Sequence, residues 1–143
     1  MNEIPEISWI ACMHEGIPVA NENLEKCIKF YTEVLGLRLL ARPLALDEFG
    51  PGAWLGDEKD TVQFHLIGSD KSTIPGEEAR IDPTSRHTAW QIKDVDALRN
   101  RLRLLKVDFQ EITSLLGIPQ IFVLDPQGFT WEFQGPPEQH PRK

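Results

Sequence analysis

The stretch VQFHLI, residues 62–67, decides the fold because it has the composition of a β-strand with a histidine near its middle. Side chains alternate across a strand, so Gln63 and His65 share one face and the apolar side chains share the other. The apolar face needs cover from another element. What the imidazole does depends on which other residues reach its face.

The segments around this stretch follow an order that occurs twice along the chain. In the first half we expect a strand over residues 7–17, a helix through NLEKCIKFYTEVLG, and three strands in LRLLARPL, AWL and TVQFHLI. Asn21 and Asn23 are the candidate N-caps of this helix, and Gly36 is its expected C-terminal stop. In the second half we expect a strand in HTAWQI, a helix capped by Asp94, and three strands in VDFQEI, PQIFVL and FTWEFQ. A repeated strand–helix–strand–strand–strand unit therefore organises the sequence.

The repeat predicts an α+β fold of tandem βαβββ modules. We expect a single domain over residues 1–143, with module one at about 7–68, a linker at about 69–85, module two at about 86–135 and a tail at 136–143. Each module has one amphipathic helix, whose apolar stripe covers one face of the module's sheet. The other face stays open, so two such half-barrels would form a cupped sheet around a cleft.

Composition and charge restrict the classes of partner. The chain has 15 basic and 22 acidic residues and a net charge of −7, which argues against nucleic acid and anionic membranes as partners. Cys12 and Cys27 are too few for a disulfide framework, which is typical of a reducing compartment. The sequence also lacks the features of a signal peptide or a membrane span. We therefore expect a soluble, cytoplasmic protein.

Four polar residues fall at matching positions on the open faces of the two modules. His14 and His87 lie in the first expected strand of each module, while His65 and Glu132 lie in the last. A lone strand histidine is usually a hydrogen-bonded structural residue, and a lone glutamate is usually solvated. The repeated placement of all four indicates a metal site instead. Three imidazoles and one carboxylate suit Zn, Ni, Co, Fe or Mn.

Several motifs give the chain a resemblance to the vicinal oxygen chelate superfamily, which includes glyoxalases, bleomycin resistance proteins and extradiol dioxygenases. These motifs are HEGIPV, NLEKCIKFYTEVLGL, GAWL with VQFHLI, RHTAWQIKDVDAL and FVLDPQGFTWEF. The resemblance implies paired βαβββ modules around a divalent metal held by His14, His65, His87 and Glu132. Many glyoxalases carry glutamate at the position of His65, so this ligand set departs from theirs. The resemblance also implies a homodimer, in which the site lies within one chain or between two.

The resemblance implies a glyoxalase-like lyase or isomerase that acts on a small carbonyl or thioester substrate. The metal would stabilise an enediolate, and Glu132 would serve as the catalytic base. One alternative is an Fe(II) extradiol-type dioxygenase, in which His14, His87 and Glu132 bind iron and His65 acts beside the substrate. Another is a drug-binding protein without catalysis.

Other residues have more limited expected roles. Gln63 and Gln91 lie on the ligand faces and are possible substrate contacts. We expect Trp9, Trp54, Trp90 and Trp131 to anchor the core, with a place in the lining of the cleft as the alternative for Trp54. We expect Cys12 to fill the core and Tyr31 to be structural.

Overall fold

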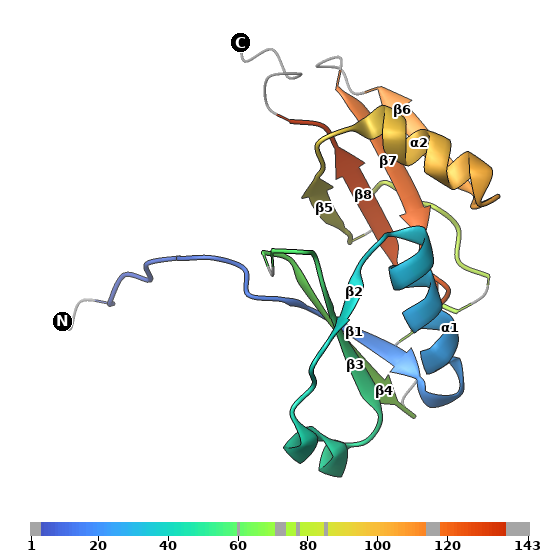
Figure 1. Ribbon diagram of the computed structural model, residues 1–143. Helices are drawn as coiled ribbons and strands as arrows, with labels where there is room; N and C mark the ends of the chain where they lie inside the picture. Colours follow the sequence, from blue (N-terminus) through green and yellow to red (C-terminus); the bar gives the residue numbers. More distant parts are fainter. Residues whose placement is uncertain are drawn as a thin grey trace.

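The computed structural model describes residues 4–59, 61–70, 74–76, 78–84, 86–113 and 118–136 (Figure 1). The tail beyond residue 136, most of the loop at 113–119 and parts of the linker at 69–85 lie outside these ranges. We therefore restrict every structural statement to the described residues.

The first module is a four-stranded mixed sheet with a helix on one face. Its elements are β1 (Glu15–Ala20), α1 (Leu24–Lys29), β2 (Arg38–Leu40), β3 (Gly52–Gly56) and β4 (Gln63–Ser69). The strand order is β1-β4-β3-β2, with β1 parallel to β4 and the other neighbours antiparallel. Short 3-10 turns at Asn21–Asn23 and Leu44–Phe49 and a π-helical turn at Phe30–Val34 complete the module.

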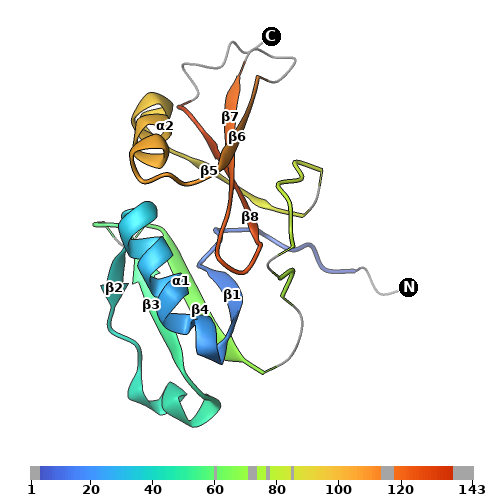
Figure 2. The ribbon, with the colours of Figure 1, turned by 90° about the vertical axis from the view of Figure 1, so that its right-hand side faces the viewer.

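The second module repeats this topology. Its elements are β5 (Thr88–Gln91), α2 (Val95–Leu104), β6 (Phe109–Thr113), β7 (Pro119–Leu124) and β8 (Thr130–Gln134). The strand order β5-β8-β7-β6 matches that of the first sheet, and β5 is parallel to β8. Figure 2 shows both helices on the same side of the molecule. The predicted α+β fold with two βαβββ modules is confirmed, and the two sheets stay separate rather than closing into a barrel.

The two helices begin differently. Asp94 accepts a hydrogen bond from the backbone N–H of Ala97 at 3.0 Å, which confirms the predicted cap of α2. Asn23 precedes α1 without a side-chain capping bond. The π-helical turn at Phe30–Val34 continues α1, and the helical segment stops just before Gly36, as expected. Gly36 has a φ of 74°, a left-handed conformation that favours glycine.

Aromatic rings from both modules form one shared core. Tyr31 from the first helical segment packs against Phe64 of β4 and Trp131 of β8, with ring centroids 5.6 and 6.1 Å away. Its hydroxyl donates to Asp125 Oδ2 at 2.5 Å and accepts from Trp131 Nε1 at 3.1 Å. Asp125 begins the predicted DPQG turn, whose Gly128 N–H bonds back to the Asp125 carbonyl. Tyr31 is therefore structural, as predicted.

The predicted first strand is wrong in its first half. Residues 4–14 have no regular structure, and both Trp9 and Cys12 are exposed, so neither belongs to the core. The reason is the sheet register, in which Glu15 of β1 lies opposite Phe64 near the start of β4. Residues before Glu15 have no neighbouring strand in the described chain, so their apolar pattern has no sheet to join.

Candidate functional site

The two modules place the predicted ligands at the same points of their sheets. Glu15 pairs with Phe64 in the first sheet, and Thr88 pairs with Trp131 in the second. The predicted position of two histidines within the first strands is wrong, because His14 and His87 directly precede this pair and lie just before β1 and β5. His65 of β4 and Glu132 of β8 directly follow it. His14 thus corresponds to His87, and His65 corresponds to Glu132, as the sequence repeat predicts.

The second module brings its two candidate ligands into direct contact. His87 Nε2 lies 2.7 Å from Glu132 Oε2. Glu132 is only 4% exposed, and its other oxygen accepts hydrogen bonds from the side-chain amides of Gln120, at 2.6 Å, and Gln134. The ring of Phe122 packs edge-on against the His87 ring. The two amides therefore hold Oε1 of Glu132, and Oε2 is directed at the imidazole of His87.

The first module arranges its two candidate ligands as a ring stack. The centroids of His14 and His65 are 4.0 Å apart, and Trp54 stacks on His65 at the same distance. His65 Nε2 lies 3.2 Å from Gln63 Oε1. Burial and the neighbouring His14 lower the pKa of His65, so its imidazole favours the neutral form that binds metals.

The histidines of the two pairs line different pockets. His14 and His65 line a mostly apolar pocket of about 690 Å³, together with Met13, Leu46, Phe49 and Trp54 among others. His87 lines a second pocket of about 630 Å³, which also includes Glu15, Arg80 and Arg86. Among the described residues, no three side chains of histidine, cysteine, aspartate or glutamate converge to hold an ion. One chain therefore assembles the predicted set as two pairs and does not bring all four residues together.

The two predicted substrate contacts, Gln63 and Gln91, lie in different surroundings. Gln63 lines the apolar pocket beside His65. Trp54 lines it too, which matches the alternative given for this residue and not the predicted core position. Gln91 instead donates a weak hydrogen bond to the Gly135 carbonyl at 3.5 Å. Arg42 borders the pocket, but its guanidinium binds the loop that follows it, through Asp47, Leu46 O and Gly50 O.

Sequence reasoning missed Gln120 and Gln134 as groups that hold Glu132. The signal for Gln134 was its place two residues after Glu132, on the same face of β8. Gln120 lies directly opposite Gln134 in the antiparallel β7–β8 pair. Finding it required the register of the two strands, which the sequence does not state.

With this geometry established, comparison with known proteins identifies the family. The family model of the Glyoxalase/Bleomycin resistance protein/Dioxygenase superfamily matches residues 7–133. The chain belongs to this superfamily. Among curated proteins, none matches the sequence.

Solved structures with the same fold have diverse described roles. A glyoxalase/dioxygenase from Nostoc punctiforme is 20% identical, with a TM-score of 0.71 and 99% of each chain covered. TnmS3, an antibiotic binding protein from Streptomyces, is 21% identical, with a TM-score of 0.68 and coverage of 92% of this chain and 99% of that one. A variant of the fosfomycin resistance protein FosX from Listeria monocytogenes, complexed with Mn(II), is 19% identical, with a TM-score of 0.65 and coverage of 94% and 97%. At these identities the likeness concerns the fold alone.

No helix in the described part of the chain is long and apolar enough to cross a membrane.

Proposed function

We propose that the protein is a divalent-metal-dependent, glyoxalase-like enzyme that acts on a small carbonyl or thioester substrate. In this proposal His14, His65, His87 and Glu132 are the metal ligands. The module-one pair of one chain and the module-two pair of a second chain form each site. The metal is one of Zn, Ni, Co, Fe or Mn.

The contact between His87 and Glu132 is the observation that carries this proposal. Metal–nitrogen and metal–oxygen bonds to Zn are about 2.0–2.2 Å long, so neighbouring ligands on one ion lie roughly 3 Å apart. The 2.7 Å between His87 Nε2 and Glu132 Oε2 is close to this separation. The amides of Gln120 and Gln134 fix the carboxylate from behind, as partners of metal ligands commonly do.

The separation of the two pairs supports a site shared between chains. Two donors cannot hold a catalytic ion firmly, because catalytic sites commonly use three or more protein ligands. Each chain presents one pair in each module. Two identical chains related by a two-fold axis could therefore form two equal sites of four donors. The rings of His14 and His65 would turn out of their stack to direct nitrogen lone pairs at an ion.

The chemistry of the donor set suits proton transfer next to a carbonyl. When bound, the metal would stabilise the negative charge that develops on the substrate oxygen. Glu132 is the proposed base. Because Gln120 and Gln134 hold Oε1, Oε2 is the atom that would bind the metal, and it would accept the proton only after leaving the ion. Burial of Glu132 keeps bulk water away from this oxygen.

The pocket beside His65 supports an apolar substrate group. Met13, Leu46, Phe49 and Trp54 supply apolar and aromatic lining. Arg42 lines the same pocket, but its guanidinium is engaged by Asp47 and two loop carbonyls. An aliphatic or aromatic substituent would therefore fit here better than a carboxylate.

Metal analysis combined with paired variants tests this proposal. We expect natively purified protein to contain about one divalent ion per chain, and the variants His65→Ala and Glu132→Ala to lose most of it. Glu111→Ala is a matched control, because Glu111 is a carboxylate on the same sheet that pairs with Arg99. Full metal content in both site variants would refute the ligand assignment.

Mixing variants tests whether the site is shared. A His14→Ala/His65→Ala chain and a His87→Ala/Glu132→Ala chain should each fail to bind metal alone. Refolded together, they should regain binding, because one of the two sites in the mixed dimer has all four ligands. No recovery, despite dimer formation, would place the site within one chain.

A small-molecule binding protein without catalysis is the second candidate. The apolar pocket beside Trp54 favours it, as does the shared fold with an antibiotic binding protein. Binding of an aromatic probe such as 2-naphthol to metal-free protein, undiminished in Glu132→Ala, would support this alternative. Exchange of an α-proton in heavy water that requires Glu132 would support the enzyme.

A further inference from the structure

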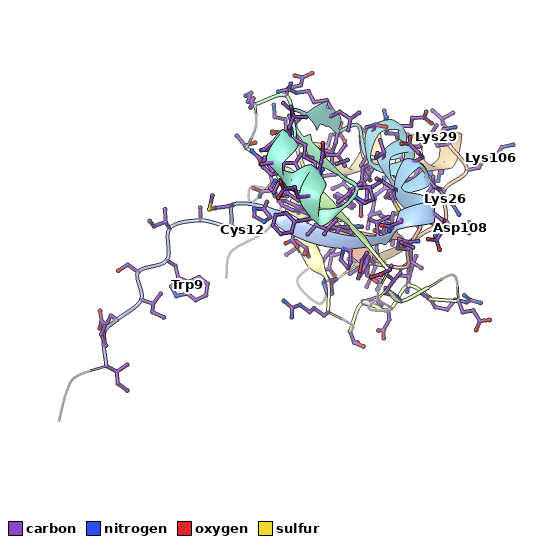
Figure 3. All side chains as sticks on the ribbon, turned by 90° about the horizontal axis from the view of Figure 1, so that it is seen from below. Trp9, Cys12, Lys26, Lys29, Lys106 and Asp108 are labelled. Carbon is purple, nitrogen blue, oxygen red and sulfur yellow. The ribbon has the colours of Figure 1, made fainter. Side chains whose placement is uncertain are left out.

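The 3-10 turn Leu44–Phe49 supplies part of the lining of the apolar pocket beside His65. The turn joins β2 to β3 and lies at the lower end of the molecule in Figure 1, so it is at the front of Figure 3, which is seen from below. Leu46 and Phe49 of this turn line the pocket. Phe49 is 83% exposed, so most of its ring remains available for contact with a ligand.

Arg42 holds this turn in place through its guanidinium. Nη1 donates to Asp47 Oδ1 at 2.7 Å, and Nη2 donates to the carbonyls of Leu46, at 3.1 Å, and Gly50, at 3.0 Å. The Arg42 side chain is only 18% exposed. Hydrogen bonds from a charged donor are stronger than neutral ones, and a planar guanidinium makes several of them in a fixed geometry. One side chain thus ties the middle of the turn to the residue that follows it.

The sequence after the turn makes room for this guanidinium. A Cβ on Gly52 would lie 3.2 Å from Arg42 Nε and 3.3 Å from Arg42 Nη2, which is tighter than an ordinary contact. Gly50, whose carbonyl accepts one of the bonds, has a φ of 113°, a conformation that favours glycine. Because both terminal nitrogens of Arg42 already have acceptors, this arginine is suited to shaping the pocket and not to binding an anionic ligand.

Three stacked rings line the same pocket. The centroids of Trp54 and His14 each lie 4.0 Å from that of His65, with interplanar angles of 1° and 17°. Two rings that lie this close and nearly parallel to a third ring must cover its opposite faces. Trp54 therefore keeps one face that no other ring in the described part of the chain covers. Planar aromatic groups stack favourably on such a face.

We propose that Arg42 is a positioning residue for the substrate, and that the substrate group held by Trp54 and the 44–49 turn is a planar aromatic ring, an inference that rests on the proposed function. The proposed function places an apolar group of a small carbonyl substrate in this pocket. Arg42 acts through Leu46 and Phe49, which touch the ring, and does not touch it itself. A wall that is already in place costs less to order on binding than a mobile one.

Two neutral ketones with the same carbon skeleton, phenylacetone and cyclohexylacetone, test the substrate group. NMR titration of the natively purified, full-length protein gives both dissociation constants and follows the Trp54 indole N–H signal. We expect phenylacetone to bind roughly 3- to 10-fold more tightly, because stacking adds to the effect of buried area. Equal affinities, no binding, or no shift of the Trp54 signal would overturn the aromatic assignment.

Variants of the guanidinium test the positioning role. Arg42→Met keeps an apolar stem but removes all three hydrogen bonds, so it should weaken phenylacetone binding roughly 10-fold and abolish its preference over cyclohexylacetone. Arg42→Lys should restore neither, since one ammonium cannot reproduce the three bonds. The matched control is Arg38→Met, because Arg38 also binds loop carbonyls, those of Asp57 and Glu58, but lies outside the pocket lining. Wild-type preference in Arg42→Met, or full rescue by Arg42→Lys, would overturn the positioning role.

Asp47 variants keep the test independent of the folding of Arg42→Met. Asp47→Ala removes one bond at a side chain that is 67% exposed, so the variant should fold and show a reduced preference for phenylacetone. Asp47→Asn keeps an acceptor for Arg42 and should retain the preference. Unchanged preference in Asp47→Ala would contradict the proposal.

Metal content, measured on every variant, separates this inference from the metal site. None of the hydrogen bonds of Arg42 involves a candidate ligand, so Arg42→Met should keep its metal. A protein that binds no metal but prefers phenylacetone through Arg42 would refute the ligand assignment alone. Normal metal content with equal binding of the two ketones in wild type would refute only the inference about the aromatic ring.

Discussion

Glu15 and Thr88 occupy the same register position in the two modules, and they touch each other. The Thr88 hydroxyl donates to Glu15 Oε1 at 3.1 Å. The first strands of both modules therefore start side by side, consistent with a local two-fold relation between the modules. His14 and His87, each one residue earlier, nevertheless line different pockets. The internal symmetry of one chain thus keeps the two ligand pairs apart. This is why we propose that a second chain completes each metal site.

Gln120 offers a test of the proposed metal site that leaves all four ligands in place. Gln120→Leu removes the hydrogen bond to Glu132 Oε1. We expect the affinity for Zn or Ni to fall about 10- to 100-fold, because groups that orient a ligand affect binding on that scale. The measurement is competition with a chelator of known affinity. Gln110→Leu, an exposed amide on β6, should bind metal like wild type. Equal affinities for both variants would contradict a role for Glu132 as a ligand.

Tyr31 is expected to be a large contributor to stability. Tyr31→Phe keeps the packing of the ring but removes the donor to Asp125 and the acceptor of Trp131 Nε1. Because both partners are buried, we expect the free energy of unfolding to fall by about 1–3 kcal/mol. Urea unfolding measures this change. Thr32→Val, which removes a hydroxyl bond within the same helical segment, should cost less. A neutral Tyr31→Phe substitution would show that water replaces the hydroxyl.

Asp125 should give stability a characteristic pH dependence. Burial raises the pKa of its carboxyl, although hydrogen bonds from Tyr31 and the turn backbone oppose this shift. The folded chain then binds the proton more tightly than the unfolded chain. This contribution to stability is full below the unfolded pKa of about 4 and is lost as the pH rises through the folded pKa.

Asp125→Asn removes that titration. Between about pH 4 and pH 7, the free energy of unfolding of wild type should decrease relative to that of Asp125→Asn as the pH rises. Urea unfolding across this range gives the difference, in which contributions of other carboxyls cancel. A difference that does not vary with pH would mean that the Asp125 pKa is the same in both states.

Two glycines in the first sheet should differ in how well they tolerate alanine. A Cβ on Gly68 would lie 2.6 Å from Asn21 Oδ1 and closer still to the Pro51 carbonyl oxygen, which accepts the Gly68 N–H bond. We expect Gly68→Ala to lower the free energy of unfolding by about 1–3 kcal/mol or more. A Cβ on Gly16 meets only Ile67 Cδ1 at 3.5 Å, an ordinary contact. Thermal unfolding should therefore show a clear loss for Gly68→Ala and little for Gly16→Ala.

The sequence predicted the repeat and the faces of its strands because both follow from local periodicity. The alternation in VQFHLI placed Phe64 in the core and His65 on the open face, and the structure has both there. The start of β1 was not predictable in this way. Residues 7–14 have the apolar composition of a strand, but pairing depends on where β4 begins, which is a tertiary property. Trp9 was misplaced for the same reason.

The sequence predicted which candidate ligands lie together within each module, but not how far apart the two pairs are. Equivalent positions in a repeat identify which residues share a face, and His87 and Glu132 do meet. The distance between the two pairs depends on how the modules pack against each other. That packing is set by the interlocked side chains of Tyr31, Phe64 and Trp131, which lie far apart in sequence. No local pattern carries this information.

The aromatic contacts of Tyr31, Phe64 and Trp131 between the modules have a consequence for how such a duplicated protein can evolve. The two halves look like copies of one ancestral unit, yet Tyr31 in one relies on Asp125 and Trp131 in the other. Either half produced alone would have polar groups without their hydrogen-bond partners and aromatic side chains exposed to water. The two halves are therefore expected to fold only together.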